Sequence, residues 1–258
     1  MTGGLSASRR FGGIERLYGA GALARLAQAH VCVIGIGGVG SWAVETLARS
    51  GVGRLTLIDL DHVAESNLNR QAHALEATLG RAKVQAMGER IAQINPACTV
   101  NGIEEFIAPA NVATLLQACA PVDLVLDCID QVRAKAALIG HCRAADLPVI
   151  TTGGAGGRTD PTRIRVDDLA CTAQDALAAK LRATLRRAHG FPREPKRMFG
   201  VPCVYSDEPI RRPAGADFCL DGAAGLACAG YGSSMAVTAG FGLAAAARAL
   251  GILAPPSS

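Results

Sequence analysis

The sequence has few aromatic and few charged residues. Of its 258 residues, 4% are aromatic, 19% are charged and half are hydrophobic. So apolar a composition excludes a disordered, self-repelling chain, because the chain can bury enough apolar surface to form a core. Since aromatics are scarce and 30 residues are glycine, small side chains must do much of the packing. The net charge of +4 permits an anionic partner but does not demand one.

Three further signatures are missing. None of the nine cysteines forms a CxxC pair, so the sequence indicates neither a thioredoxin-type redox centre nor a four-thiolate zinc site, and we expect no structural zinc. No Walker sequence is present, which excludes a P-loop NTPase. The first eight residues hold no apolar run typical of a secretory signal. We therefore expect a cytoplasmic protein with reduced thiols.

Short apolar runs alternate with segments of helical periodicity over the first 152 residues. The expected strands are 31–34, 55–59, 99–103, 123–127 and 148–151, and the expected helices are 39–47, 82–94, 111–118 and 133–145. Continuous apolar runs are typical of strands that are covered on both faces. Their alternation with helices predicts an α/β fold with a mostly parallel, doubly wound sheet.

The pattern changes after Thr152. A glycine-rich loop at 153–157 precedes an expected exposed strand at 163–166 and an expected helix at 173–188, and 191–213 is expected to loop over the surface. We therefore distinguish residues 1–152 from residues 153–258, an additional C-terminal strand and helix region, and expect both to belong to one continuous domain.

Residues 223–247 carry no formal charge, and this stretch is long enough to cross a membrane. Its composition argues against membrane insertion, because alanine and glycine dominate over leucine. We therefore expect a buried core or dimer helix, and keep membrane association as the alternative.

A glycine-rich turn follows the first expected strand and opens the first helix. Its glycines are Gly35, Gly37, Gly38 and Gly40. Glycines there allow a tight turn and a close approach to a phosphate, and the amides of the helix start point at the anion. Asp59 ends the next strand about 20 residues later, where a carboxylate can hydrogen-bond a ribose hydroxyl. The combination predicts a Rossmann-like nucleotide site; the alternative is that the glycines only allow close packing.

Polar and charged residues then accumulate in a way that a simple dehydrogenase does not need. They are Asp61, Asn67, Asn69, Arg70, Gln71 and Lys83, followed by Asp130 beyond the strand that ends at Asp127. Two cations could neutralise a triphosphate and a leaving pyrophosphate, and a carboxylate could hold Mg²⁺ between phosphates. The alternative is that Arg70 and Lys83 only solvate a helix start, although cations there oppose the helix dipole.

The motifs GIGGVG, LIDLDHVAESNLNRQ, LGRAK and LVLDCID together resemble the ubiquitin-activating-enzyme-like superfamily over residues 10–152. The resemblance implies that this region binds ATP for adenylation. By the same resemblance, Gly37 and its neighbours line the nucleotide, Asp59 binds the ribose, Asn67, Arg70 and Lys83 contact the phosphates, and Asp130 is the acid on the magnesium side. It also implies a homodimer in which an N-terminal arginine reaches the partner's phosphates. Arg10 and Arg16 are the candidates, and Gly13 stands where the sulfur-carrier enzymes have their arginine.

A second resemblance runs nearly end to end. The segments RRFGGIERLYG, TTGGAGGRTDPTRIRVDDL, DALAAKLR and GVPCVYSDE are similar to a branch of that superfamily that modifies tRNA. The resemblance implies ATP-dependent cyclisation, with net loss of water, of the threonylcarbamoyl group on the adenosine beside the anticodon. AMP would first be transferred to the threonine carboxylate. Two alternatives remain open: an adenylyltransferase for a ubiquitin-like sulfur carrier, and a non-catalytic nucleotide-binding or redox-sensing module.

Two features of the C-terminal region bear on that reading. Cys228 aligns with a cysteine of the resembling enzymes and precedes an expected helix start, a position that can make a thiol nucleophilic. A buried packing role is the alternative, and exchange with a cysteine-desulfurase or sulfur-acceptor system is conceivable. A basic cluster, with few acids between its members, suits an RNA backbone and predicts salt-sensitive binding. Its members are Lys180, Arg182, Arg186, Arg187, Arg193, Lys196, Arg197, Arg211 and Arg212.

Overall fold

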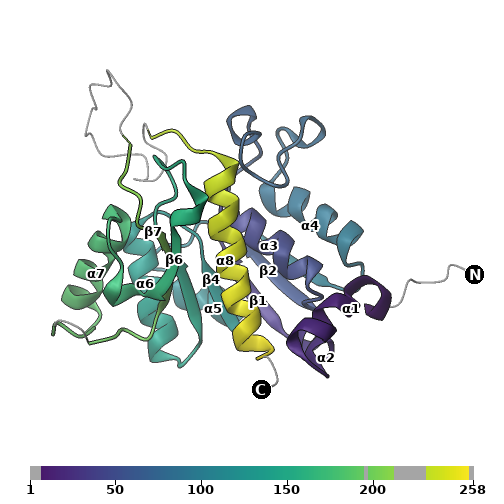
Figure 1. Cartoon of the computed structure of the whole chain (residues 1–258), viewed down its shortest axis with the longest axis horizontal. Helices are drawn as coiled ribbons and strands as arrows, with labels where there is room; N and C mark the ends of the chain where they lie inside the picture. Colours follow the sequence, from purple (N-terminus) through teal and green to yellow (C-terminus); the bar gives the residue numbers. More distant parts are fainter. Residues whose placement is uncertain (1–6, 195–196, 212–230, 256–258) are drawn as a thin grey trace, which may run out of the picture.

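The computed structural model describes residues 7–194, 197–211 and 231–255, which are built around one sheet (Figure 1). Seven strands of this part pair in the order β3-β2-β1-β4-β5-β7-β6. Their bounds are β1 His30–Ile34, β2 Arg54–Ile58, β3 Thr99–Ile103, β4 Leu124–Asp127, β5 Val149–Thr152, β6 Ile164–Asp168 and β7 Pro202–Ser206. Every neighbouring pair is parallel except β6 with β7. The predicted α/β, mostly parallel, Rossmann-like sheet is confirmed.

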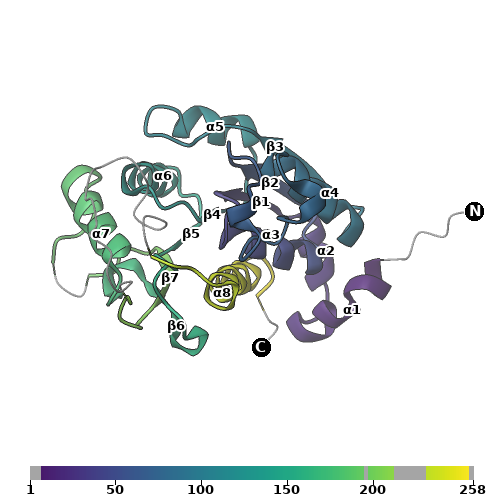
Figure 2. The ribbon, with the colours of Figure 1, turned by 90° about the horizontal axis from the view of Figure 1, so that it is seen from above.

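Helices cover both faces of the sheet, as the view from above shows (Figure 2). Their bounds are α1 Ala7–Tyr18, α2 Ala22–Gln28, α3 Gly40–Arg49, α4 Lys83–Ile94, α5 Val112–Cys119, α6 Val132–Ala144, α7 Ala176–Ala188 and α8 Met235–Leu253. Alternate strand residues point to opposite faces, so Val31 and Val33 join a core with α2, α3, α4 and α8. Cys32 and Ile34 face the other core, which α5, α6 and α7 complete. Two apolar layers therefore fix the strands from both sides.

One element corrects the prediction for 191–213. This segment was expected to loop over the surface, but β7 lies within it, between β5 and β6, and its residues Cys203 and Val204 are fully buried. The prolines and arginines around this short apolar run suggested a loop. Pro202 is the first residue of β7, and the strand holds no other proline and no arginine.

Most of α8 lies in the uncharged stretch, and the helix packs along α3. A Cβ at Gly242 would overlap the carbonyl oxygen of Val39, so glycine allows the two helices to approach closely. In the described part of the chain, α8 alone is long and apolar enough to cross a membrane, and half of that stretch is buried inside the protein. This packing agrees with the expected core helix.

Candidate nucleotide-binding site

A cavity of about 280 Å³ opens at the carboxyl ends of β1, β2, β4 and β5. This is the edge at which open parallel sheets bind ligands. Its lining residues that were predicted from the sequence are Gly35, Gly37, Gly38, Asp59, Asp61, Asn67, Arg70, Lys83 and Asp130. The topology of the sheet thus brings residues up to 95 positions apart in the sequence, Gly35 and Asp130, to one cavity.

The glycine turn is close-packed as well as open to the cavity. Gly35 has a φ of +79°, and a Cβ there would lie 2.8 Å from Ile129 Cγ2. Gly40 does not line the cavity, because it begins α3, where a Cβ would overlap the carbonyl oxygen of Gly35. Gly40 therefore serves the close packing alone, whereas Gly35, Gly37 and Gly38 also line the cavity.

Asp59 is fixed directly after β2. Its Oδ2 accepts a hydrogen bond from the Ile36 amide at 2.8 Å, and its Oδ1 accepts one from the Asp61 amide at 2.9 Å. Burial raises the pKa of Asp59 above its ordinary value, against the charge of Lys83, which lowers it. The bond to Ile36 joins the carboxylate to the glycine turn, so Asp59 and the turn form one rigid unit.

Two cations reach the cavity from different elements. Lys83 begins α4, is buried, and has its Nζ 2.7 Å from Asp61 Oδ2. Arg70 lies over the turn, because a Cβ at Gly38 would be 3.1 Å from Arg70 Cγ. Its Nη1 donates to the Ser66 carbonyl at 2.7 Å. Both side chains are held by protein acceptors.

The two predicted asparagines have different positions. Asn67 lines the cavity and is buried, and its Oδ1 accepts a hydrogen bond from the Ala64 amide at 3.1 Å. Asn69 does not line the cavity. It donates through Nδ2 to the Ser233 carbonyl at 2.9 Å, and thereby ties the loop after β2 to the start of the α8 segment.

Asp130 lies beyond β4 on a loop that a buried ion pair supports. Lys135 Nζ is 2.9 Å from Asp127 Oδ2, and both side chains are fully buried. Lys135 also donates to the Ile129 carbonyl at 2.9 Å, and Thr151 donates to Asp127 Oδ2 at 2.6 Å. This pair fixes the turn that presents Asp130, and no local sequence pattern indicated Lys135.

Other lining residues were also missed. Phe106 and Ile107 follow β3, whose carboxyl end shares the edge of the sheet, so the position of that strand could have indicated them. Gln71, which the sequence places in the same polar run as Arg70, also lines the cavity, and its buried Oε1 has no hydrogen-bond partner among the described residues. Because a buried polar atom without a partner is costly, this amide fits a polar ligand in the cavity. Ser233 and Thr238 come from the α8 segment, and no local pattern marked them.

Cysteine chemistry finds little support among the described residues. Cys128 lines the cavity, but burial raises the pKa of its thiol to about 12, so it is protonated at neutral pH. Cys228, the predicted thiol, lies outside the described residues. In the described part of the chain, no group of three or more His, Cys, Asp or Glu side chains is placed to hold a metal ion.

The basic cluster divides into anchored and exposed members. Arg182 donates to Thr172, and Arg186 donates to the Pro192 carbonyl at 3.1 Å and lies 5.2 Å from the centre of the Phe199 ring. These two arginines therefore have internal structural partners. The members with exposed residues are Lys180, Arg187, Arg193, Arg197 and Arg211. Lys196 and Arg212 lie outside the described residues.

The two N-terminal arginine candidates do not line the cavity of their own chain. Both are exposed on α1, and Arg10 Nη1 donates to the Ile94 carbonyl at 3.0 Å.

The fold and this cavity define a class of protein. The chain belongs to the ThiF family, whose sequence model matches residues 11–253, so the predicted family resemblance is confirmed. It is similar to the tRNA threonylcarbamoyladenosine dehydratase of Haemophilus influenzae, at 49% identity over 94% of this chain and 92% of that one. The structure of E. coli tRNA N6-threonylcarbamoyladenosine dehydratase in complex with ATP matches with a TM-score of 0.86 and 48% identity, covering 97% and 96% of the two chains. The E. coli molybdopterin-synthase adenylyltransferase is 38% identical, over 49% of each chain.

Proposed function

We propose that this protein uses ATP to dehydrate threonylcarbamoyladenosine in tRNA, by adenylating the threonine carboxylate and letting it cyclise. The proposal rests on one observation above all. A single cavity at the ends of the parallel strands holds Asp59, Arg70, Lys83 and Asp130 together. It does so in a chain whose similarity to the dehydratases extends over nearly their whole length.

The chemistry explains why a nucleotide is consumed. A carboxylate is a poor acyl donor, because oxide would have to leave. When a carboxylate oxygen attacks the α-phosphorus of ATP, pyrophosphate departs and a mixed anhydride forms. A nucleophile of the same modified side chain then attacks the acyl carbon and AMP leaves, so the RNA loses one water in total. Ring closure within one side chain benefits from a high effective concentration.

The chain's own residues supply binding and charge compensation. Asp59 would accept a hydrogen bond from the ribose, while the glycine turn and Arg70 would face the phosphates. Lys83 has three donors, so its ammonium group can bind a phosphate oxygen while it keeps Asp61. Two fixed cations stabilise the charge that develops on the α-phosphate and on the leaving pyrophosphate.

Asp130 would hold Mg²⁺ against the phosphates. Its carboxylate lines the cavity and is partly accessible, and proteins commonly bind Mg²⁺ through one or two carboxylates together with phosphate oxygens. When bound, the ion would neutralise phosphate charge and orient the phosphates for displacement.

The partners belong to the same proposal. The exposed basic residues of and around α7 would contact the tRNA backbone, and two copies of the chain would form a homodimer in which Arg10 or Arg16 reaches the partner's phosphates. We further propose a cytoplasmic location. Cys228 remains a candidate for a nucleophilic thiol that exchanges with a sulfur-handling protein.

One assay tests the function. The protein is incubated with ATP, Mg²⁺ and tRNA that bears threonylcarbamoyladenosine, and the nucleoside is then weighed by mass spectrometry. Loss of one water with AMP release supports the proposal. An unchanged nucleoside, with AMP loaded onto the C-terminus of a ubiquitin-like sulfur carrier, would support the adenylyltransferase alternative. No AMP from either substrate would favour a non-catalytic module.

A further inference from the structure

The cavity has a second wall that lies away from the nucleotide residues. Asp59, Phe106 and Ile107 occupy the side of β2 and β3, and the glycine turn lies above β1. The remaining side consists of Gln131 after β4, of Thr152 at the end of β5, and of Gly153, Ala155 and Gly156 beyond it. Under the proposed function, on which this inference rests, the threonine carboxylate must approach the α-phosphate from that open side.

Residues 153–157, here called the glycine segment, have little structure of their own. Gly153, Ala155 and Gly156 line the cavity, and the segment forms neither helix nor strand. Four of its five residues are glycines, which lose more conformational freedom on folding than any other residue. Something outside the segment must therefore hold it in place.

Asp175 supplies that hold from the start of α7. Its Oδ1 accepts the Ala178 amide at 2.9 Å and caps the helix, while its Oδ2 accepts the Gly154 amide at 3.0 Å. The side chain is 1% exposed. A Cβ at Gly153 would overlap this carboxylate, whereas a Cβ at Gly154 would have only Leu177 Cβ nearby, at 3.9 Å.

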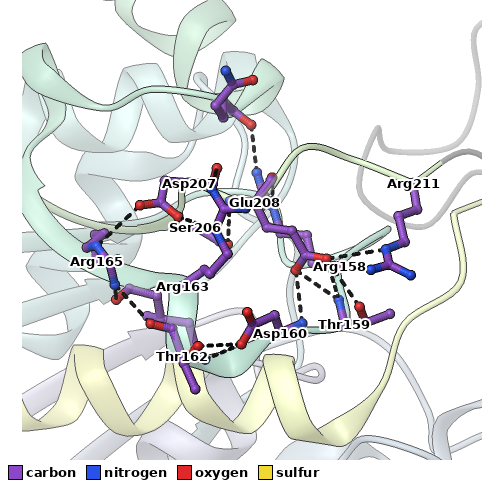
Figure 3. Close-up of polar contacts among 12 residues, drawn as sticks. Arg158, Thr159, Asp160, Thr162, Arg163, Arg165, Ser206, Asp207, Glu208 and Arg211 are labelled. Carbon is purple, nitrogen blue, oxygen red and sulfur yellow. Dashed lines mark hydrogen bonds and ion pairs between the residues drawn. The ribbon is translucent and has the colours of Figure 1, made fainter.

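Arg158 connects Asp175 to a third part of the chain. Its fully buried guanidinium lies with Nη1 3.4 Å from Asp175 Oδ2 and donates to the Gln174 carbonyl at 2.9 Å and, through Nε, to the Glu208 carbonyl at 3.3 Å. The Glu208 carboxylate accepts the amides of Thr159 at 3.0 Å and Asp160 at 2.9 Å, and Figure 3 shows it facing both residues. A buried charge persists only when it is paired, so this network fixes the exit of the glycine segment as firmly as Asp175 fixes its start.

We propose that Asp175, with Arg158 behind it, is a positioning residue for the acid-substrate side of the cavity. It contacts neither the nucleotide residues nor the cavity itself. It acts through the backbone amide of Gly154 and its close contact with Gly153, by holding the wall against which the modified nucleoside packs.

The test compares four variants with wild type: Asp175→Asn, Gly153→Ala, Gly154→Ala and Asp168→Asn. Asp168 is a control because its carboxylate also caps a turn and accepts loop amides, those of Phe199, Gly200 and Val201, but away from the cavity. Gly154→Ala is the matched control for Gly153→Ala, because it adds the same methyl group without displacing Asp175. The Kd for ATP is measured by calorimetry, and kcat and KM for the modified tRNA are measured by AMP release.

We expect Asp175→Asn and Gly153→Ala to lower kcat/KM for the modified tRNA by about a hundredfold, as a small misplacement of a substrate wall does. The Kd for ATP should change by no more than about twofold in these variants, because the nucleotide residues lie elsewhere. Both controls should keep kcat/KM near wild type. Hydrogen exchange at residues 153–157 of the free protein should accelerate in Asp175→Asn and not in Asp168→Asn.

Three results would overturn the inference: an unchanged kcat/KM in both test variants, an equal loss of ATP affinity, or equal effects of Gly153→Ala and Gly154→Ala. If Asp175→Asn does not fold, the two glycine variants still decide. A wild-type protein that releases no AMP from modified tRNA would refute the proposed function as well, whereas an active wild type with unaffected variants would refute only the role of Asp175.

Discussion

The two walls of the cavity are built in different ways. The wall that carries Asp59, Lys83 and Asp130 follows strand ends and a helix start, and the fully buried Asp127–Lys135 pair lies beneath it. The wall made by the glycine segment depends on Asp175 and on Glu208, which follows β7. Ser233 and Thr238, from the segment that contains α8, line the same cavity. The first wall is as rigid as the sheet, while the second is only as rigid as the hydrogen bonds between distant loops. Mutations beneath the first wall should therefore lower the stability of the whole protein, whereas mutations that loosen the second wall should mainly lower activity.

The largest expected effect is a loss of stability when the buried Asp127–Lys135 pair beneath the first wall is broken. Lys135→Met leaves Asp127 as an unpaired charge in the core, so we expect the free energy of unfolding to fall by about 3–5 kcal/mol. Denaturant titration measures it. The double variant Asp127→Leu/Lys135→Met should recover part of this loss, because neither charge remains. A single variant as stable as wild type would contradict the supporting role of the pair.

Asp130→Ala tests a residue of the same wall that lines the cavity. Asp130 is partly exposed, so its removal should leave the melting temperature near wild type. We expect AMP formation to drop by at least about a hundredfold, as is typical when one group that stabilises transition-state charge is lost. Glu76→Ala, an exposed acid outside the cavity, is the matched control and should retain full activity. Normal turnover of Asp130→Ala would exclude it from the site.

A pH titration tests how tightly the loop after β2 is packed. His73 is 1% exposed, and neither ring nitrogen has a hydrogen-bond partner within the described part of the chain. Burial, with the charges of Lys83 and Arg90, lowers its pKa from 6.5 to about 4. Below pH 6.5 the unfolded chain binds a proton that the folded chain does not, so stability should decrease as pH falls from 6.5 to about 4, by at most about 1.4 kcal/mol per pH unit.

His73→Leu removes this proton and no hydrogen bond. The variant should lose less stability than wild type between pH 6.5 and pH 4, as measured by thermal unfolding across that range. Parallel stability curves for the two proteins would show that His73 titrates normally in the folded state.

The smallest effect is expected on the exposed basic surface. Arg187→Ala should weaken tRNA binding modestly and lower the salt dependence of log K by about one, since a single phosphate contact is lost. Arg186→Ala should instead lower stability, because Arg186 packs on Phe199 and bonds to Pro192. Binding measured at several salt concentrations separates the two. An unchanged salt slope in Arg187→Ala would remove this residue from the RNA surface.

Much of the fold could be predicted because it rests on local patterns. Thr99–Ile103 was expected as a strand with the bounds it has, and the helix expected at 82–94 begins one residue later, at Lys83. Helices α1 and α2 carried no prediction. Strand β7 was missed because a five-residue run between prolines and arginines gives no periodicity, and only pairing with β5 and β6 makes it a strand.

The site could be predicted to the extent that its residues follow strand ends. Asp59 and Asp130 come directly after or just beyond buried strands, so parallel topology brings them to one edge. Asn69 shares the same motif but turns to Ser233, and Arg182 and Arg186 sit in a basic run yet bond inward. Side-chain direction at such positions depends on neighbours that are distant in sequence.

By itself, the sequence determined the class of fold, the glycine turn and the charged residues around it. Periodicity, glycine geometry and strand order depend on residues that are close together in the sequence. The tertiary structure alone decided which buried charges are paired, that Gly40 packs while Gly37 stays open, and that Asp175 holds the second wall. These outcomes depend on contacts between segments dozens of residues apart. A hydrogen bond or a steric overlap exists only once the chain has brought its two partners together.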